Sequence, residues 1–102
     1  MDIQETIRQQ VTTNPIVLYM KGTPQFPQCG FSANAVRILH TLGVKDFLSF
    51  DVLRDPDLRQ GIKDYANWPT IPQLYIHGEF VGGSDIMSEM FQSGELRQLI
   101  NR

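Results

Sequence analysis

Cys29 is the only cysteine in this chain of 102 residues, and that count limits how the chain can be stabilised. One cysteine cannot form a disulfide within the chain, so the sequence excludes small scaffolds whose disulfides replace a hydrophobic core. It also excludes an intrachain dithiol redox cycle and a four-cysteine metal site in one chain. Apolar residues make up 41% of the sequence, which is enough for one packed core. We therefore expect one domain, residues 1–102, in a reducing compartment such as the cytoplasm.

Charge and apolar run length exclude two classes of partner. Nine Lys and Arg against eleven Asp and Glu give a net charge of −2, whereas general nucleic-acid-binding proteins carry a basic excess. The longest apolar run, residues 16–20, is far shorter than the roughly 20 residues of a membrane-spanning helix. The start of the chain contains Asp2 and Glu5 and no apolar segment typical of a signal peptide. We expect partners other than nucleic acid or membrane.

Apolar periodicity and turn residues predict alternating helices and strands. Helices are expected over residues 2–13, from Cys29 or Gly30 to Gly43, from Asp55-Pro56 onward, from a cap at Ser84-Asp85 to Gly94, and around residues 96–100. Strands are expected over residues 16–20, 47–52, 73–77 and 80–82. The helical crossover makes the first strand pair parallel, and a tight turn at Gly78 makes the last pair antiparallel. These elements give an α/β fold with a four-stranded mixed sheet flanked by helices on both faces.

Cys29 lies where a proline-containing loop, residues 21–28, meets the start of a helix. Free backbone N–H groups and the helix dipole favour a thiolate there, and Lys21 can add a positive charge. A thiolate is both a nucleophile and a metal ligand. Ser32 takes the place of the second cysteine in a Cys-x-x-Cys pair; its hydroxyl can hydrogen-bond a thiolate but cannot resolve a mixed disulfide. Alternatively, Cys29 is a small buried hydrophobic residue and Ser32 an ordinary polar residue of a first helical turn.

Three blocks of this sequence resemble the monothiol glutaredoxins in order and spacing. They are residues 19–32 (YMKGTPQFPQCGFS, with the CGFS motif at its end), residues 68–73 (WPTIPQ) and residues 82–85 (GGSD). The likeness covers nearly the full chain and points to the short, bacterial-type members with a single glutaredoxin domain. The resemblance implies a thioredoxin-like fold in which Pro72 is cis and faces the cysteine. A cis proline would expose the backbone of Ile71 for pairing with an extended peptide. Without the resemblance, Pro72 would be interpreted as an ordinary proline of a loop.

The resemblance also implies a glutathione site, and the residue types suit that ligand. The implied site consists of Lys21, Arg59, Lys63, Thr70, Ile71, Ser84 and Asp85. Arg59 and Lys63 are four residues apart and share a helix face, although outside the family they would be a solvated face. The N–H groups near Ser84 can bind a carboxylate, and Asp85 can pair with the ligand's amine. Trp68 is expected either to pack beside its neighbouring proline or to form binding surface.

Three functions from different classes fit these residues. A [2Fe–2S] cluster typically takes four thiolate ligands, so a homodimer with one Cys29 per chain needs two glutathiones to complete the set. The resemblance implies this arrangement, whose exchangeable ligands would let the cluster pass to iron–sulfur recipient proteins. The second function is a glutathione-dependent thiol–disulfide oxidoreductase with Cys29 as the catalytic nucleophile, where another glutathione resolves the mixed disulfide. The third is an iron-status interaction module, for which the family suggests a BolA-like protein as partner.

Overall fold

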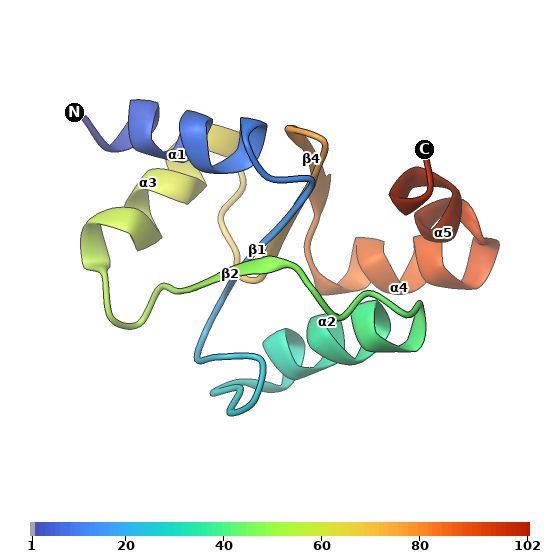
Figure 1. Ribbon diagram of the computed structural model, residues 1–102. Coiled ribbons are helices and arrows are strands. Elements are labelled where there is room, and N and C mark those ends of the chain that lie inside the picture. Colours follow the sequence, from blue (N-terminus) through green and yellow to red (C-terminus); the bar gives the residue numbers. More distant parts are fainter. Residues whose placement is uncertain (1) are drawn as a thin grey trace.

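A computed structural model describes residues 2–102. The helices are α1 (Ile3–Thr12), α2 (Gly30–Thr41), α3 (Pro56–Ala66), α4 (Ser84–Ser93) and α5 (Glu95–Ile100), and the strands are β1 (Ile16–Met20), β2 (Leu48–Asp51), β3 (Gln73–Ile76) and β4 (Glu79–Gly82). The sheet lies between two helical layers, with α1 and α3 on one side and α2, α4 and α5 on the other (Figure 1). No helix in this part of the chain has the length and apolarity to cross a membrane.

The four strands form one sheet in the order β2-β1-β3-β4. Strand β1 pairs in parallel with β2 and antiparallel with β3, and β3 pairs antiparallel with β4. The predicted parallel and antiparallel pairs are therefore confirmed. The turn between β3 and β4 contains Gly78 at a φ of +83°, the positive φ that the sequence predicts for this hairpin.

A hydrophobic core fills the space on each face of the sheet, which explains the continuous apolar run of β1. Leu18 and Met20 point into the core shared with α2, α4 and α5. Val17 and Tyr19 point to the opposite side, into the core shared with α1 and α3. Because successive side chains of a strand alternate between its faces, a strand with both faces buried is apolar at every position.

The predicted elements are all present, with ends that differ by one or two residues. The N-cap of α3 is Asp55, whose side chain accepts a hydrogen bond from the Leu58 N–H at 3.1 Å, as predicted. The prediction that Ser84-Asp85 caps α4 is wrong. Gly83 is the N-cap there, no side chain caps the helix, and Ser84 is its first residue. The helix begins one residue earlier than predicted because the extended backbone of an N-cap lies at Gly83 (φ −98°, ψ −161°). Glycine suits this position, since a Cβ there would lie 3.1 Å from the Pro72 carbonyl oxygen.

Candidate functional site

Cys29 is the N-cap of α2, at the position where the sequence predicts the helix to begin. Its backbone is extended, and its side chain turns back over the first turn of the helix. The Ser32 backbone N–H donates to Sγ at 3.3 Å. Cys29 is a partly exposed residue, and its sulfur receives a hydrogen bond from the helix N-terminus.

Ser32 connects the sulfur to the end of β1. Its side chain is fully buried, and its Oγ lies 3.3 Å from Cys29 Sγ. The same Oγ accepts a hydrogen bond from the Lys21 backbone N–H at 3.0 Å. Because that bond occupies a lone pair and leaves the hydroxyl proton free, Ser32 can donate to a thiolate at Cys29. This contact matches the interpretation of Ser32 as a thiolate partner.

The surroundings of Cys29 shift its pKa in opposing directions. Partial burial of the sulfur raises the pKa of the thiol, because the charged form loses hydration. Hydrogen bonds from the Ser32 hydroxyl and from the backbone N–H groups of Ser32 and Phe31, together with the Lys21 ammonium, lower it. The net result is a pKa of Cys29 below that of an ordinary thiol. The site therefore favours the nucleophilic and metal-binding form.

The loop over residues 21–28 folds back on itself and returns the chain to Lys21. The Gln28 N–H donates to the Lys21 carbonyl at 2.8 Å. Gly22 has a φ of +90°, and a Cβ on it would lie 2.5 Å from the Phe26 carbonyl oxygen, so this position requires glycine. Asp51, at the end of β2, accepts a hydrogen bond from the Gly22 N–H at 2.9 Å. These contacts fix Cys29 beside the end of β1.

The peptide bond between Ile71 and Pro72 is cis, as the resemblance implies. Gln73, which is fully buried, holds the segment of residues 68–70 that precedes this bond. Its Nε2 donates to the carbonyl oxygens of Trp68 and Thr70, each at 3.2 Å, and its Oε1 accepts from the Tyr75 hydroxyl at 3.3 Å. The sequence gives Gln73 no predicted role. Its signal is a polar residue in a strand that is otherwise apolar.

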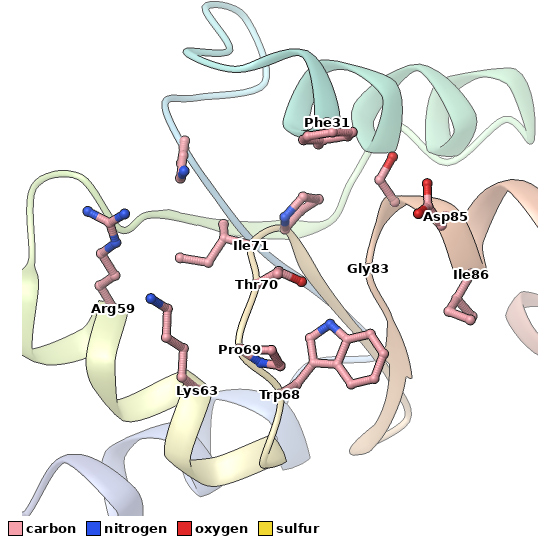
Figure 2. A pocket seen from close by; sticks show the side chains of 13 residues that line it. Phe31, Arg59, Lys63, Trp68, Pro69, Thr70, Ile71, Gly83, Asp85 and Ile86 are labelled. Atoms are coloured by element: carbon pink, nitrogen blue, oxygen red, sulfur yellow. The ribbon is translucent and has the colours of Figure 1, made fainter.

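A cleft of about 350 Å³ brings the predicted glutathione-site residues together. All seven line it: Lys21, Arg59, Lys63, Thr70, Ile71, Ser84 and Asp85. Figure 2 shows Arg59 and Lys63 projecting from α3 on one side, the segment of Thr70 and Ile71 in the middle, and Asp85 on the far side. The cleft thus has cations at one end and a carboxylate at the other. Such a distribution suits an elongated ligand that carries both carboxylates and an amine.

Apolar residues that the sequence does not assign to a ligand site also line this cleft. Phe31, two residues after Cys29, is 66% exposed at its upper edge in Figure 2. Ile86 lies on α4. Trp68 lines the cleft, as the surface alternative predicts, and its ring also packs on Phe80 with ring centroids 5.6 Å apart. The sequence feature that could have identified Phe31 as a cleft residue is its large apolar side chain two positions after Cys29.

Ser84 is buried at the α4 side of the cleft, where it contacts the helix that carries Cys29. The residue is 8% exposed, and its Oγ accepts a hydrogen bond from Asn34 Nδ2 at 2.9 Å. Since Ser84 is the first residue of α4, its backbone N–H lies in the first turn, where helical amides lack partners within the helix. Across residues 2–102, no three His, Cys, Asp or Glu side chains gather as a metal site.

Comparisons with known proteins show which family this sequence and fold are similar to. The family model for glutaredoxin matches residues 16–81. A Synechocystis protein named as a monothiol glutaredoxin (ycf64-like) is 58% identical over 94 residues, which cover 92% of this chain and 87% of the relative. Glutaredoxin 4 of Escherichia coli is 55% identical over 96 residues, or 94% of this chain and 83% of the relative. The solution structure of reduced poplar apo GrxS14 matches with a TM-score of 0.84 at 49% identity, covering 97% of this chain and 90% of that one.

Proposed function

The chain belongs to the glutaredoxin family and has its thioredoxin-like fold, and from that premise we propose that it carries [2Fe–2S] clusters. In this proposal a homodimer of single-domain monothiol chains holds the cluster as cargo and passes it to iron–sulfur recipient proteins. The observation that supports it is one thiol with a lowered pKa, Cys29, whose neighbours Lys21 and Phe31 line a cleft with charges that suit glutathione, although Cys29 itself is not part of that lining. Because a free thiol persists in a reducing compartment, we place this function in the cytoplasm.

The number of thiolates accounts for the proposed assembly. A [2Fe–2S] cluster typically takes four thiolate ligands, and each chain contributes one, since Cys29 is the only cysteine. Two chains and two bound glutathiones complete the set. Half of the ligands are then exchangeable small molecules, so the cluster can leave more readily than one held by four protein cysteines. A carrier requires this lability.

The charges of the cleft suggest how glutathione lies. Lys21, Arg59 and Lys63 supply cations for carboxylates, through charge-assisted hydrogen bonds. The first turn of α4 offers backbone N–H groups near Ser84 for another carboxylate, and Asp85 suits the ligand's amine. The backbone of Ile71 beside the cis proline can pair with the extended peptide. The glutathione thiol would then project toward Cys29 and the shared cluster.

Anaerobic reconstitution tests the carrier. The protein is incubated with iron, sulfide and glutathione, and the products are analysed by visible absorption, circular dichroism and mass. We expect a [2Fe–2S] chromophore in a dimer that contains two glutathiones. The matched control is Cys29→Ser, which should form no chromophore while it keeps the wild-type melting temperature. A normal cluster yield in Cys29→Ser would overturn the assignment of Cys29 as ligand.

The lowered pKa of Cys29 also favours a second function, glutathione-dependent thiol–disulfide exchange. The Cys29 thiolate would attack the glutathione sulfur of a glutathionylated protein, breaking that disulfide and releasing the protein thiolate, which takes up a proton. A second glutathione thiolate would then attack the Cys29-bound glutathione, releasing the Cys29 thiolate and glutathione disulfide. Turnover of a glutathionylated protein by apo wild type, absent in Cys29→Ser, would support this function. A stable cluster with negligible turnover would favour the carrier alone.

A further inference from the structure

Asn34 joins the helix that carries Cys29 to the helix that forms one wall of the cleft. It lies in α2, and its Nδ2 donates to two hydroxyl oxygens of α4, Ser84 Oγ at 2.9 Å and Ser88 Oγ at 3.1 Å. Ser84 lines the cleft, whereas Ser88 lies one helical turn further along and outside its lining. One amide therefore binds a serine of the site and a serine away from it.

Arg37 determines which way the Asn34 amide faces. The Arg37 guanidinium donates to Asn34 Oδ1 at 2.6 Å. Since a guanidinium carries donors and no acceptor, the atom that faces it must be the amide oxygen. The amide NH₂ then faces the two serines, and both serine oxygens act as acceptors. Asn34 then does not use the hydroxyl proton of Ser84, and Ser84 is one of the residues that line the cleft.

We propose that Asn34 is a positioning residue that makes Ser84 a hydrogen-bond donor toward a carboxylate of bound glutathione; this inference rests on the proposed glutathione site. In this chain of hydrogen bonds Arg37 donates to Asn34, Asn34 donates to Ser84, and Ser84 would donate to the ligand. Each hydrogen bond polarises the next. Because Ser84 is almost fully buried, little water competes for its hydroxyl. A hydrogen bond to a charged acceptor is about twice as strong as a neutral one, so this orientation selects an anionic group.

Asn34→Asp reverses the direction of the hydrogen bond between residue 34 and Ser84 with almost no change in side-chain shape. The aspartate accepts hydrogen bonds but cannot donate them, so the Ser84 hydroxyl turns toward it and away from the cleft. The probe is S-methylglutathione, which cannot form disulfides, titrated calorimetrically into the apo protein. We expect about tenfold weaker binding, the size of one lost hydrogen bond to a charged group. In a Ser84→Ala background the same substitution should have much less effect, because the hydroxyl that it redirects is absent.

Ser88→Ala is the matched control. It removes the other acceptor of the same amide without touching the cleft, so it should leave the affinity for S-methylglutathione at the wild-type value. Thermal melts of each variant report its folding. If Asn34→Asp folds poorly, Arg37→Met tests the same hydrogen bonds, because the Asn34 amide loses the partner that orients it. We expect a smaller loss of affinity for S-methylglutathione than in Asn34→Asp, and only when Ser84 is present.

Two outcomes would overturn the inference while leaving the glutathione site intact. One is that Asn34→Asp lowers the affinity for S-methylglutathione equally with and without Ser84, which would show a general effect of the added charge. The other is that Ser88→Ala lowers this affinity as much as Asn34→Asp does, which would show that the Asn34 amide only packs the two helices together. A folded wild type that binds no S-methylglutathione would overturn the proposed glutathione site and this inference together.

Discussion

At the scale of single residues, the reactivity of Cys29 depends on its neighbours more than on its exposure. Burial of the sulfur disfavours the thiolate, and the contacts of Ser32, the helix amides and Lys21 outweigh that effect and lower the pKa of Cys29. Only the thiolate reacts with an alkylating agent, so the rate of iodoacetamide labelling should reach half of its plateau at a lower pH than for an ordinary thiol. We expect Ser32→Ala to move this midpoint to higher pH.

The labelling measurement needs a control that alters charge without altering the hydroxyl contact. Lys21→Met serves this purpose, because Lys21 contacts Ser32 through its backbone N–H, which the substitution keeps. Its ammonium is the weakest contributor to the lowered pKa, so the midpoint should rise less than in Ser32→Ala. The same midpoint in wild type and Ser32→Ala would contradict the role of Ser32 as a thiolate partner.

At the scale of elements, the loop of residues 21–28 depends on the backbone of Gly22. Gly22→Ala should destabilise the protein by about 1–3 kcal/mol or more, because the new Cβ meets the Phe26 carbonyl oxygen and the positive φ is strained. Gly30→Ala is the control: it lies in the first turn of α2 with nothing within 4 Å of an added Cβ. Denaturant unfolding should show little loss for it. Equal stability of the two variants would contradict this view of the loop.

The order of helices and strands was predictable from the sequence, whereas the contacts that shape the cleft were not. The apolar run of β1 and the Asp55-Pro56 helix start are local signals, and the structure confirms both. The N-cap of α4 is Gly83, where a Cβ would lie 3.1 Å from the Pro72 carbonyl oxygen, a contact that the periodicity of α4 does not reveal. Asn34 and Ser84 are 50 positions apart. No periodicity of either helix shows that they meet, and three-dimensional packing alone sets such a pair.

At the scale of the whole molecule, the cleft combines cations from two separate parts of the chain, the loop that follows β1 and helix α3. Replacing Lys21 with Met, or Arg59 and Lys63 together with Gln, should weaken glutathione-dependent cluster retention by about tenfold or more per lost charge-assisted bond. The apo proteins should melt like wild type, since these side chains lie outside both cores. Raising glutathione should restore the cluster in these variants but not in Cys29→Ser. Unchanged glutathione dependence in every charge variant would mean that the ligand binds elsewhere.

The assembly state is the property that the proposed cargo should control. Among residues 2–102, the exposed large apolar side chains are Phe26, Phe31 and Leu53, a small set compared with the apolar surface of an obligate dimer. We therefore expect the apo protein to sediment mainly as a monomer and the protein reconstituted with cluster and glutathione as a dimer. Chelation of the iron should return the dimer to monomer, because the shared ligands are then lost. Cys29→Ser, treated identically, should stay monomeric throughout. A single mass for apo and fully loaded wild type would show that the cluster does not drive dimerisation.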